Sequence, residues 1–169
     1  FVGFGDPIFN SKQAALSDKG EVWTQAMVSR GLSRGVSRGV LKTHGVPLVL
    51  RAAPAVRGMG KADISRLPRL KDTADEIKSI ATAMNADPAR DVFLGRRASE
   101  SRVKSMDLSN YRVITFATHG LVPGDLDGLD QPALAMTAPE VLGEKGDGLL
   151  TMGEILTLKL DADWVVLSA

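Results

Sequence analysis

The chain has 169 residues, a net charge of +1, 44% hydrophobic and 24% charged residues, values typical of one globular domain with its own core. No apolar run approaches the ~18 residues that cross a bilayer, so a transmembrane helix is excluded and no membrane partner is expected. The chain has no cysteine, which excludes disulfides and thiolate metal sites in these residues and fits a cytoplasmic location.

The charge is unevenly distributed along the sequence. Residues 1–70 carry a net +7 and residues 71–169 a net −6. A basic half can indicate nucleic-acid binding. Aromatic residues make up only 5% of this chain, however, and its basic residues lie in a Gly/Ser-containing tract, so no nucleic-acid partner is expected.

Residues 1–5 form an apolar, glycine-spaced segment that predicts a strand, closed by Asp6 and a proline. Gly3 and Gly5 could begin a dinucleotide-binding G-x-G-x-x-G pattern, but Ile8 takes the third glycine position. The fingerprint fails, and we expect no cofactor.

From about residue 10 to 66 the periodicity weakens. Residues 29–40 contain three tandem Ser-Arg-Gly repeats, and glycine at every fourth position costs a helix about 1 kcal/mol per site. We interpret residues 10–66 as a flexible surface insertion. A protease-sensitive activation loop with exposed arginines is the alternative.

Regular structure returns at residue 67. A capping box over residues 73–76 predicts the start of a helix that buries one apolar face, followed by a strand at residues 91–94. Ser99 predicts a helix that extends to Met106, and a β-branched strand follows at residues 112–118. The face of the first helix consists of Ile77, Ile80, Ala81 and Met84.

A second capping box at residues 151–154 predicts a short helix, and residues 164–168 predict the last strand. Strands that alternate with helices predict an α/β fold with a mostly parallel central sheet, helices on both faces and right-handed crossovers.

His119 and Gly120 directly follow the strand at residues 112–118. Reacting groups in open α/β sheets collect past the carboxyl ends of strands, so His119 is a candidate catalytic residue, with a structural histidine as the alternative. Gly120 offers an unobstructed N–H. The segment from 121 to 148 is too long for an ordinary connection, which favours a functional loop.

Other chemistries find less support in the sequence. A metal site would need converging ligands, and His44 with a few aspartates does not supply a recognisable pattern, so no metal is expected. Ser168 lacks the G-x-S-x-G context of a hydrolase nucleophile, because Val166 precedes it by two positions. If strands 112–118 and 164–168 are parallel neighbours, a nucleophile after the second strand could meet His119, with the Gly120 N–H facing an oxyanion.

Two segments carry a family resemblance: Phe-Ala-Thr-His-Gly at 116–120 and Ala-Asp-Trp-Val-Val-Leu-Ser-Ala at 162–169. They closely resemble the hallmark motifs of CHAT domains, bacterial caspase-like peptidase domains often fused to tetratricopeptide repeats. The resemblance also covers residues 5–7, 67–68, the helix with Glu76, and residues 146–151.

The resemblance implies a caspase-like fold and a His–Cys dyad in which His119 is the catalytic histidine and Gly120 an oxyanion donor. The family's cysteine is expected immediately after Ala169, so residues 1–169 are expected to be the N-terminal part of one CHAT domain and inactive alone. It also implies a protein or peptide substrate and a tetratricopeptide-repeat region in the parent chain. A catalytically silent interaction module is the alternative.

Three aspartates, Asp125, Asp127 and Asp130, follow His119 on the expected active edge. We hypothesise that they favour a basic substrate residue. The alternative is that these Asp/Gly steps only form turns.

Overall fold

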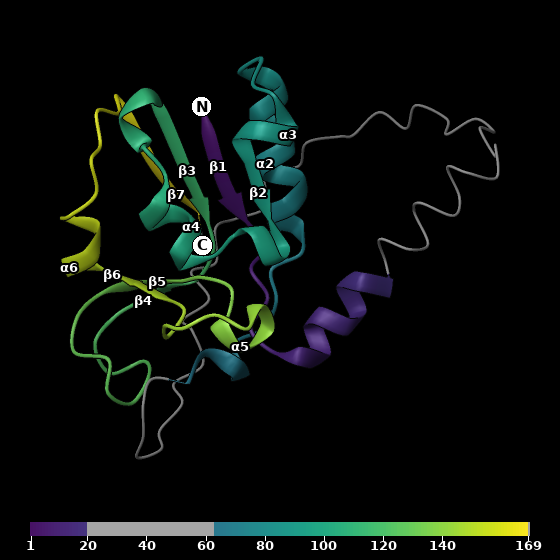
Figure 1. Ribbon diagram of the computed structural model, residues 1–169, viewed down its shortest axis with the longest axis vertical. Helices are drawn as coiled ribbons and strands as arrows, with labels where there is room; N and C mark the ends of the chain where they lie inside the picture. The colour runs from purple at the N-terminus through teal and green to yellow at the C-terminus, as the bar shows by residue number, and fades with distance from the viewer. Residues whose placement is uncertain (20–62, 169) are drawn as a thin grey trace, which may run out of the picture.

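The computed structural model describes residues 1–19 and 63–168. A four-stranded sheet has the order β2-β1-β3-β7, and all its neighbouring strands are parallel. The arrowheads of β1, β2 and β3 point to the same edge, beside a smaller second sheet (Figure 1). The α/β prediction and the parallel pairing of the strand before His119 with the last strand are confirmed. The four strands are β1 (Val2–Gly5), β2 (Val92–Leu94), β3 (Val113–Ala117) and β7 (Trp164–Ser168).

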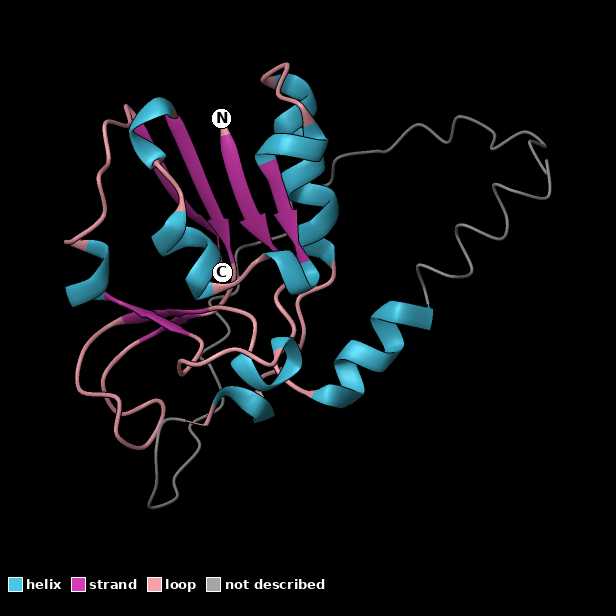
Figure 2. Ribbon diagram, in the orientation of Figure 1, coloured by secondary structure: helices cyan, strands magenta, loops and turns pink. Residues whose placement is uncertain are grey.

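Helices cover both faces of this sheet (Figure 2). On one face, α2 (Asp72–Ala83) buries Ile77 and Ala81 against Val92 and Ala117. The other face packs against α4 (Glu100–Ser105) and the 3-10 turn η3 (Leu108–Asn110). The remaining short elements here are α3 (Pro88–Asp91) and η2 (Gly95–Arg97).

Three phenylalanines on adjacent strands form the centre of the second face. Phe4 pairs in register with Phe93 on one side and Phe116 on the other. Their rings stack with centroids 5.2 and 5.1 Å apart. Stacked aromatic pairs of this kind contribute energy beyond their buried area, so they fix the register of three strands.

The glycine spacing of β1 has a packing cause. A Cβ on Gly3 would lie 2.7 Å from Ile77 Cγ2, and one on Gly5 would lie 3.0 Å from Ile77 Cγ1. Only glycine therefore lets α2 approach β1 this closely, and the close approach seals one face of the sheet.

The segment from 121 to 148, which we expected to be a loop, contains regular structure. Together with Gly120 and residues 149–151, it forms a three-stranded antiparallel sheet of order β4-β5-β6 beyond the carboxyl edge of the large sheet. The pattern was missed because each strand has only two or three residues, too few for periodicity to register. These elements are β4 (Gly120–Leu121), β5 (Ala133–Ala135), α5 (Pro139–Leu142) and β6 (Leu149–Thr151).

The capping box expected at residues 73–76 is wrong. The helix α2 begins at Asp72, and its N-cap position, Lys71, makes no side-chain capping bond. The Thr73 hydroxyl instead donates to the Leu70 carbonyl (2.6 Å) and accepts from the Asp6 N–H (2.8 Å). A tertiary contact to the end of β1 has replaced the local cap.

The other helix starts follow their sequence signals. Ser99 caps α4 by accepting from Arg102 N, and this helix ends at Ser105, with Met106 as its C-cap. The second capping box is confirmed in α6 (Met152–Ile155), where Thr151 and Glu154 bond reciprocally. Local side-chain chemistry sufficed at both places.

Residues 11–19 are helical and η1 (Ile64–Arg66) is a 3-10 turn, so both described ends of the expected insertion have regular structure. The Ser-Arg-Gly repeats and His44 fall outside the described residues. In the ranges 1–19 and 63–168, no helix has both the length and the apolar character needed to cross a membrane.

Candidate active site

The carboxyl ends of β3 and β7 lie side by side. Ala117 pairs with Ser168 in the parallel ladder, and the next amide, Thr118 N, donates to the Ser168 carbonyl at 2.9 Å. The ladder thus extends to the residue directly before His119. The carboxyl end of β7 therefore lies at the same edge of the sheet as His119.

The His119 ring is half-buried and held from two directions. Its Nε2 lies 2.8 Å from the Pro68 carbonyl oxygen, and the Phe9 ring lies 5.6 Å away at a tilt of 45°. A carbonyl only accepts hydrogen bonds, so Nε2 is the donor. In the neutral imidazole the proton is then on Nε2, and Nδ1 keeps its lone pair. This arrangement leaves Nδ1 as the basic atom.

Gly120 begins β4, the edge strand of the small sheet. It pairs with Leu134, and the adjacent Ala135 N donates to the His119 carbonyl at 2.9 Å. This bond makes Gly120 and Leu134 a non-hydrogen-bonded antiparallel pair, so the Gly120 N–H points away from β5. Gly120 is exposed, and a Cβ added to it would have no atom within 4 Å. The N–H is open to a ligand.

Thr118, between strand and histidine, links the two sheets. Its amide bonds to β7, and its hydroxyl donates to the Ala135 carbonyl in a short hydrogen bond. It is 3% exposed. Thr118 thereby fixes the backbone that carries His119 and Gly120 to both sheets.

The three aspartates lie in the connection between β4 and β5. Asp125 accepts from Val122 N at 2.8 Å, which closes a turn, and Asp127 is half-buried. Asp130 is exposed and precedes β5, whereas His119 bonds to Ala135 at the other end of that strand. Their selection of a basic substrate residue stays a prediction, which cleavage of a peptide library by the full-length protein would test.

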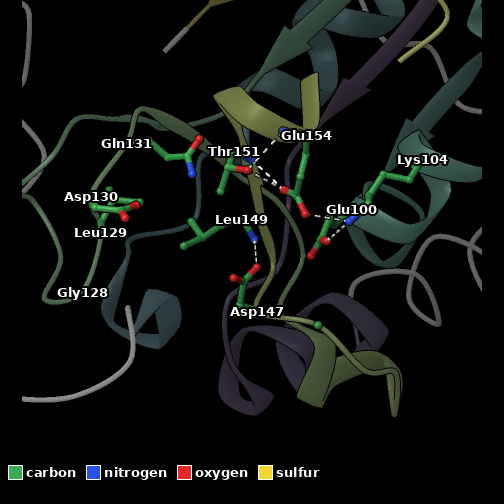
Figure 3. Close-up of a pocket in the computed structure, with 11 residues that line it drawn as sticks. Glu100, Lys104, Gly128, Leu129, Asp130, Gln131, Asp147, Leu149, Thr151 and Glu154 are labelled. Atoms are coloured by element: carbon green, nitrogen blue, oxygen red, sulfur yellow. Dashed lines mark hydrogen bonds and ion pairs between the residues drawn. The ribbon is translucent and has the colours of Figure 1, made fainter. Parts of the chain in front are cut away.

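Asp130 also lines a cavity of about 600 Å³ between α4, α6 and β6. Figure 3 shows Asp130 and Gln131 across the cavity from Glu100 and Lys104. The Lys104 ammonium donates to Glu100 Oε1 (2.8 Å) and Glu154 Oε1 (2.7 Å), and these two bonds hold the pKa of Lys104 well above its usual range.

The pKa of Glu154 is shifted in the opposite direction. Burial alone would raise the pKa of Glu154, but hydrogen bonds from Lys104 and Thr151 outweigh it and lower the pKa. The cavity wall is therefore an ion-paired cluster that joins α4 to α6. Among the described residues, no three His, Cys, Asp or Glu side chains gather as a possible metal site.

The sequence interpretation missed an ion pair on the segment that contacts His119. Arg69 and Asp6 form an ion pair of 2.6 Å next to the Pro68 carbonyl. An arginine after Leu-Pro and an aspartate after a strand were the available signals, but nothing in the sequence shows that they meet.

Comparison with protein-family models gives a match to the CHAT domain over residues 11–169. Searches of curated proteins and of solved structures returned no significant match. The family match covers all but the first ten residues, and it includes β3 with His119 and all of β7. The chain therefore belongs to the CHAT domain family, which is related to cysteine peptidases.

Proposed function

We propose that this CHAT domain is a caspase-like cysteine endopeptidase with a His–Cys dyad. His119 supplies the histidine, and the cysteine is the residue expected immediately after Ala169. The proposal rests on the CHAT family match and on the resemblance of residues 162–169 to the motif that precedes the family's cysteine.

One observation carries the proposal. The Thr118 N–H donates to the Ser168 carbonyl at 2.9 Å, so the chain leaves β7 beside the backbone that carries His119. A thiol placed there would emerge at the edge where the Nδ1 lone pair is free. Nucleophile and base need to come within hydrogen-bond reach, and neighbouring parallel strands, about 4.8 Å apart, support such an approach.

The reaction then follows from these groups. Nδ1 of His119 takes the thiol proton, and the thiolate sulfur attacks the carbonyl carbon of the scissile peptide. The carbonyl oxygen becomes an oxyanion and accepts a hydrogen bond from the Gly120 N–H. The C–N bond breaks as Nδ1 returns the proton to the leaving amine. Water, deprotonated by the same imidazole, hydrolyses the thioester and releases the acid product and the free thiol.

The Pro68 carbonyl has a defined role in this scheme. By accepting from Nε2–H it keeps the imidazole in the tautomer whose Nδ1 is basic, and it stabilises the imidazolium that forms after proton transfer. No carboxylate is required for either effect.

The test is a peptidase assay on the full-length protein with peptide and protein substrates. His119→Ala and replacement of the expected cysteine by alanine should each abolish cleavage, while Asp75→Asn, at an exposed position of α2, serves as a folded control. Cleavage that survives His119→Ala would refute the dyad. A full-length protein without any activity, or with another residue at the cysteine position, would favour the silent interaction module.

A further inference from the structure

The segment that presents the Pro68 carbonyl to His119 is anchored on both flanks. On one side, Leu67 is 1% exposed, and its carbonyl accepts from Gln13 Nε2 at 2.9 Å. On the other side, Arg69 Nε and Nη2 donate to the two carboxylate oxygens of Asp6, both at 2.6 Å. Bidentate, charge-assisted hydrogen bonds of this kind stabilise the contact and also fix the relative orientation of the two side chains.

The Asp6–Arg69 pair is withdrawn from solvent. The two side chains are only 9% and 11% exposed, and Arg69 Nη2 also donates to Ser17 Oγ at 3.2 Å. Asp6 is itself fixed, since its N–H donates to Thr73 Oγ1 at 2.8 Å and its φ is 51°. The pair therefore connects the end of β1, the start of α2 and the helical residues 11–19 at one point.

Its effect on Pro68 follows from the covalent chain. The Pro68 carbonyl and the Arg69 N–H belong to the same planar peptide unit, so anchoring Arg69 sets the direction of that carbonyl. Proline has no N–H of its own to hold the segment, which leaves the task to its neighbours. The carbonyl then fixes Nε2 of His119 at 2.8 Å.

We propose that the Asp6–Arg69 ion pair is a positioning device for His119: it holds the Pro68 carbonyl where that oxygen selects the Nε2–H tautomer. Its effect on catalysis rests on the proposed peptidase function, whereas its effect on the imidazole does not. Neither Asp6 nor Arg69 touches the reacting atoms, so both are positioning residues.

The main test uses the full-length protein with both charges removed, as D6N/R69M. Removing one partner alone would leave a buried charge unpaired, and removing both avoids that cost. Asparagine tolerates the positive φ at position 6 that most residues disfavour. The matched control is D18N/R96M, which removes an exposed ion pair of 3.0 Å between the helical residues 11–19 and η2, together with the Arg96 bond to the Val141 carbonyl.

The first readout is ¹⁵N NMR of histidine-labelled protein at a pH where the imidazole is neutral, with the His119 signals assigned by their loss in H119Q. The parent and D18N/R96M should show a protonated Nε2 and a bare Nδ1. D6N/R69M should show a mixture of both tautomers. A folded D6N/R69M that keeps the pure Nε2–H form would overturn the proposal.

The second readout is peptidase kinetics. In D6N/R69M, kcat should fall by roughly 10- to 100-fold with KM unchanged, the scale of misplacing a catalytic group by up to about 1 Å. R69K keeps the positive charge, but its ammonium cannot make the bidentate bond of the guanidinium. It should retain the Nε2–H tautomer with an intermediate kcat. If D6N/R69M does not fold, the test rests on R69K. A kcat and a tautomer that both match the parent would then refute the positioning role of the Asp6–Arg69 pair. If the parent protein cleaves nothing, the peptidase proposal fails, and the NMR result alone decides the positioning role.

Discussion

The Gly120 N–H offers the sharpest test of the proposed chemistry, because it can be removed while its surroundings stay in place. Gly120→Pro deletes this N–H, whereas Gly120→Ala keeps it. The N–H points away from β5, and proline is tolerated on the outward side of an edge strand, so the ladder to β5 keeps its bonds. A Cβ at position 120 would have no atom within 4 Å apart from its chain neighbours, so the β-carbon of either variant has room.

The expected loss is large. Removing one oxyanion donor costs about 10²–10³ in kcat, or roughly 3–4 kcal/mol of transition-state stabilisation. The full-length Gly120→Pro protein should lose kcat by this factor and keep its unfolding midpoint, while Gly120→Ala should stay close to the parent in both. Initial rates over a range of peptide concentrations separate kcat from KM. A folded Gly120→Pro protein with parent-like kcat would refute the assignment of this N–H to the oxyanion.

Three further predictions concern the scaffold, each measured by urea unfolding. Gly3→Ala should destabilise by roughly 1–3 kcal/mol, because its Cβ would lie 2.7 Å from Ile77 Cγ2; additivity with Ile77→Ala would contradict that contact. Thr115→Val should stabilise by about 1 kcal/mol, since within the described part of the chain the buried Thr115 hydroxyl has no partner; a loss of stability would show that it has one. The lowered pKa of Glu154 means that its carboxylate stabilises the fold above its ordinary pKa and loses this effect as the pH falls through the lowered value. Glu154→Gln should therefore flatten the acid limb of stability against pH, and an unchanged limb would contradict the role of Lys104.

The large sheet and the place of His119 could be predicted because their signals are local. Strands β1, β3 and β7 are each a mainly apolar run bounded by turn residues. Helices α4 and α6 each have a side-chain N-cap. From these, the rule for parallel connections places β3 beside β7, and the carboxyl edge of the sheet follows.

The small sheet could not be predicted in the same way. Residues 133–135 and 149–151 are each three residues long. They are strands because they pair with each other, and residues 133–135 also pair with Gly120–Leu121. Their buried Ala133, Leu134 and Leu149 gain their hydrophobic environment only after this pairing. Tertiary contacts decide such short segments, and no window of the sequence contains those contacts.

The dependence on tertiary contacts also explains why the sequence pointed to His119 but not to the residues around it. The candidate histidine can be recognised from the residues next to it in the sequence, whereas the groups proposed to orient it come from distant positions. Asp6 and Arg69 are 63 residues apart, and Pro68 is 51 residues from His119. Chain-order reasoning treats Asp6 as the residue that ends a strand and Pro68 as the residue that precedes a helix. In the fold, the parallel sheet brings the ends of β1 and β3 to one edge, and the Pro68 carbonyl contacts the imidazole. If the Asp6–Arg69 pair has the proposed role, the position of the imidazole proton depends on the topology of the fold. A chain that kept His119 and Gly120 but lost the Asp6–Arg69 contact would then retain the motif without the orientation that the proposed chemistry needs.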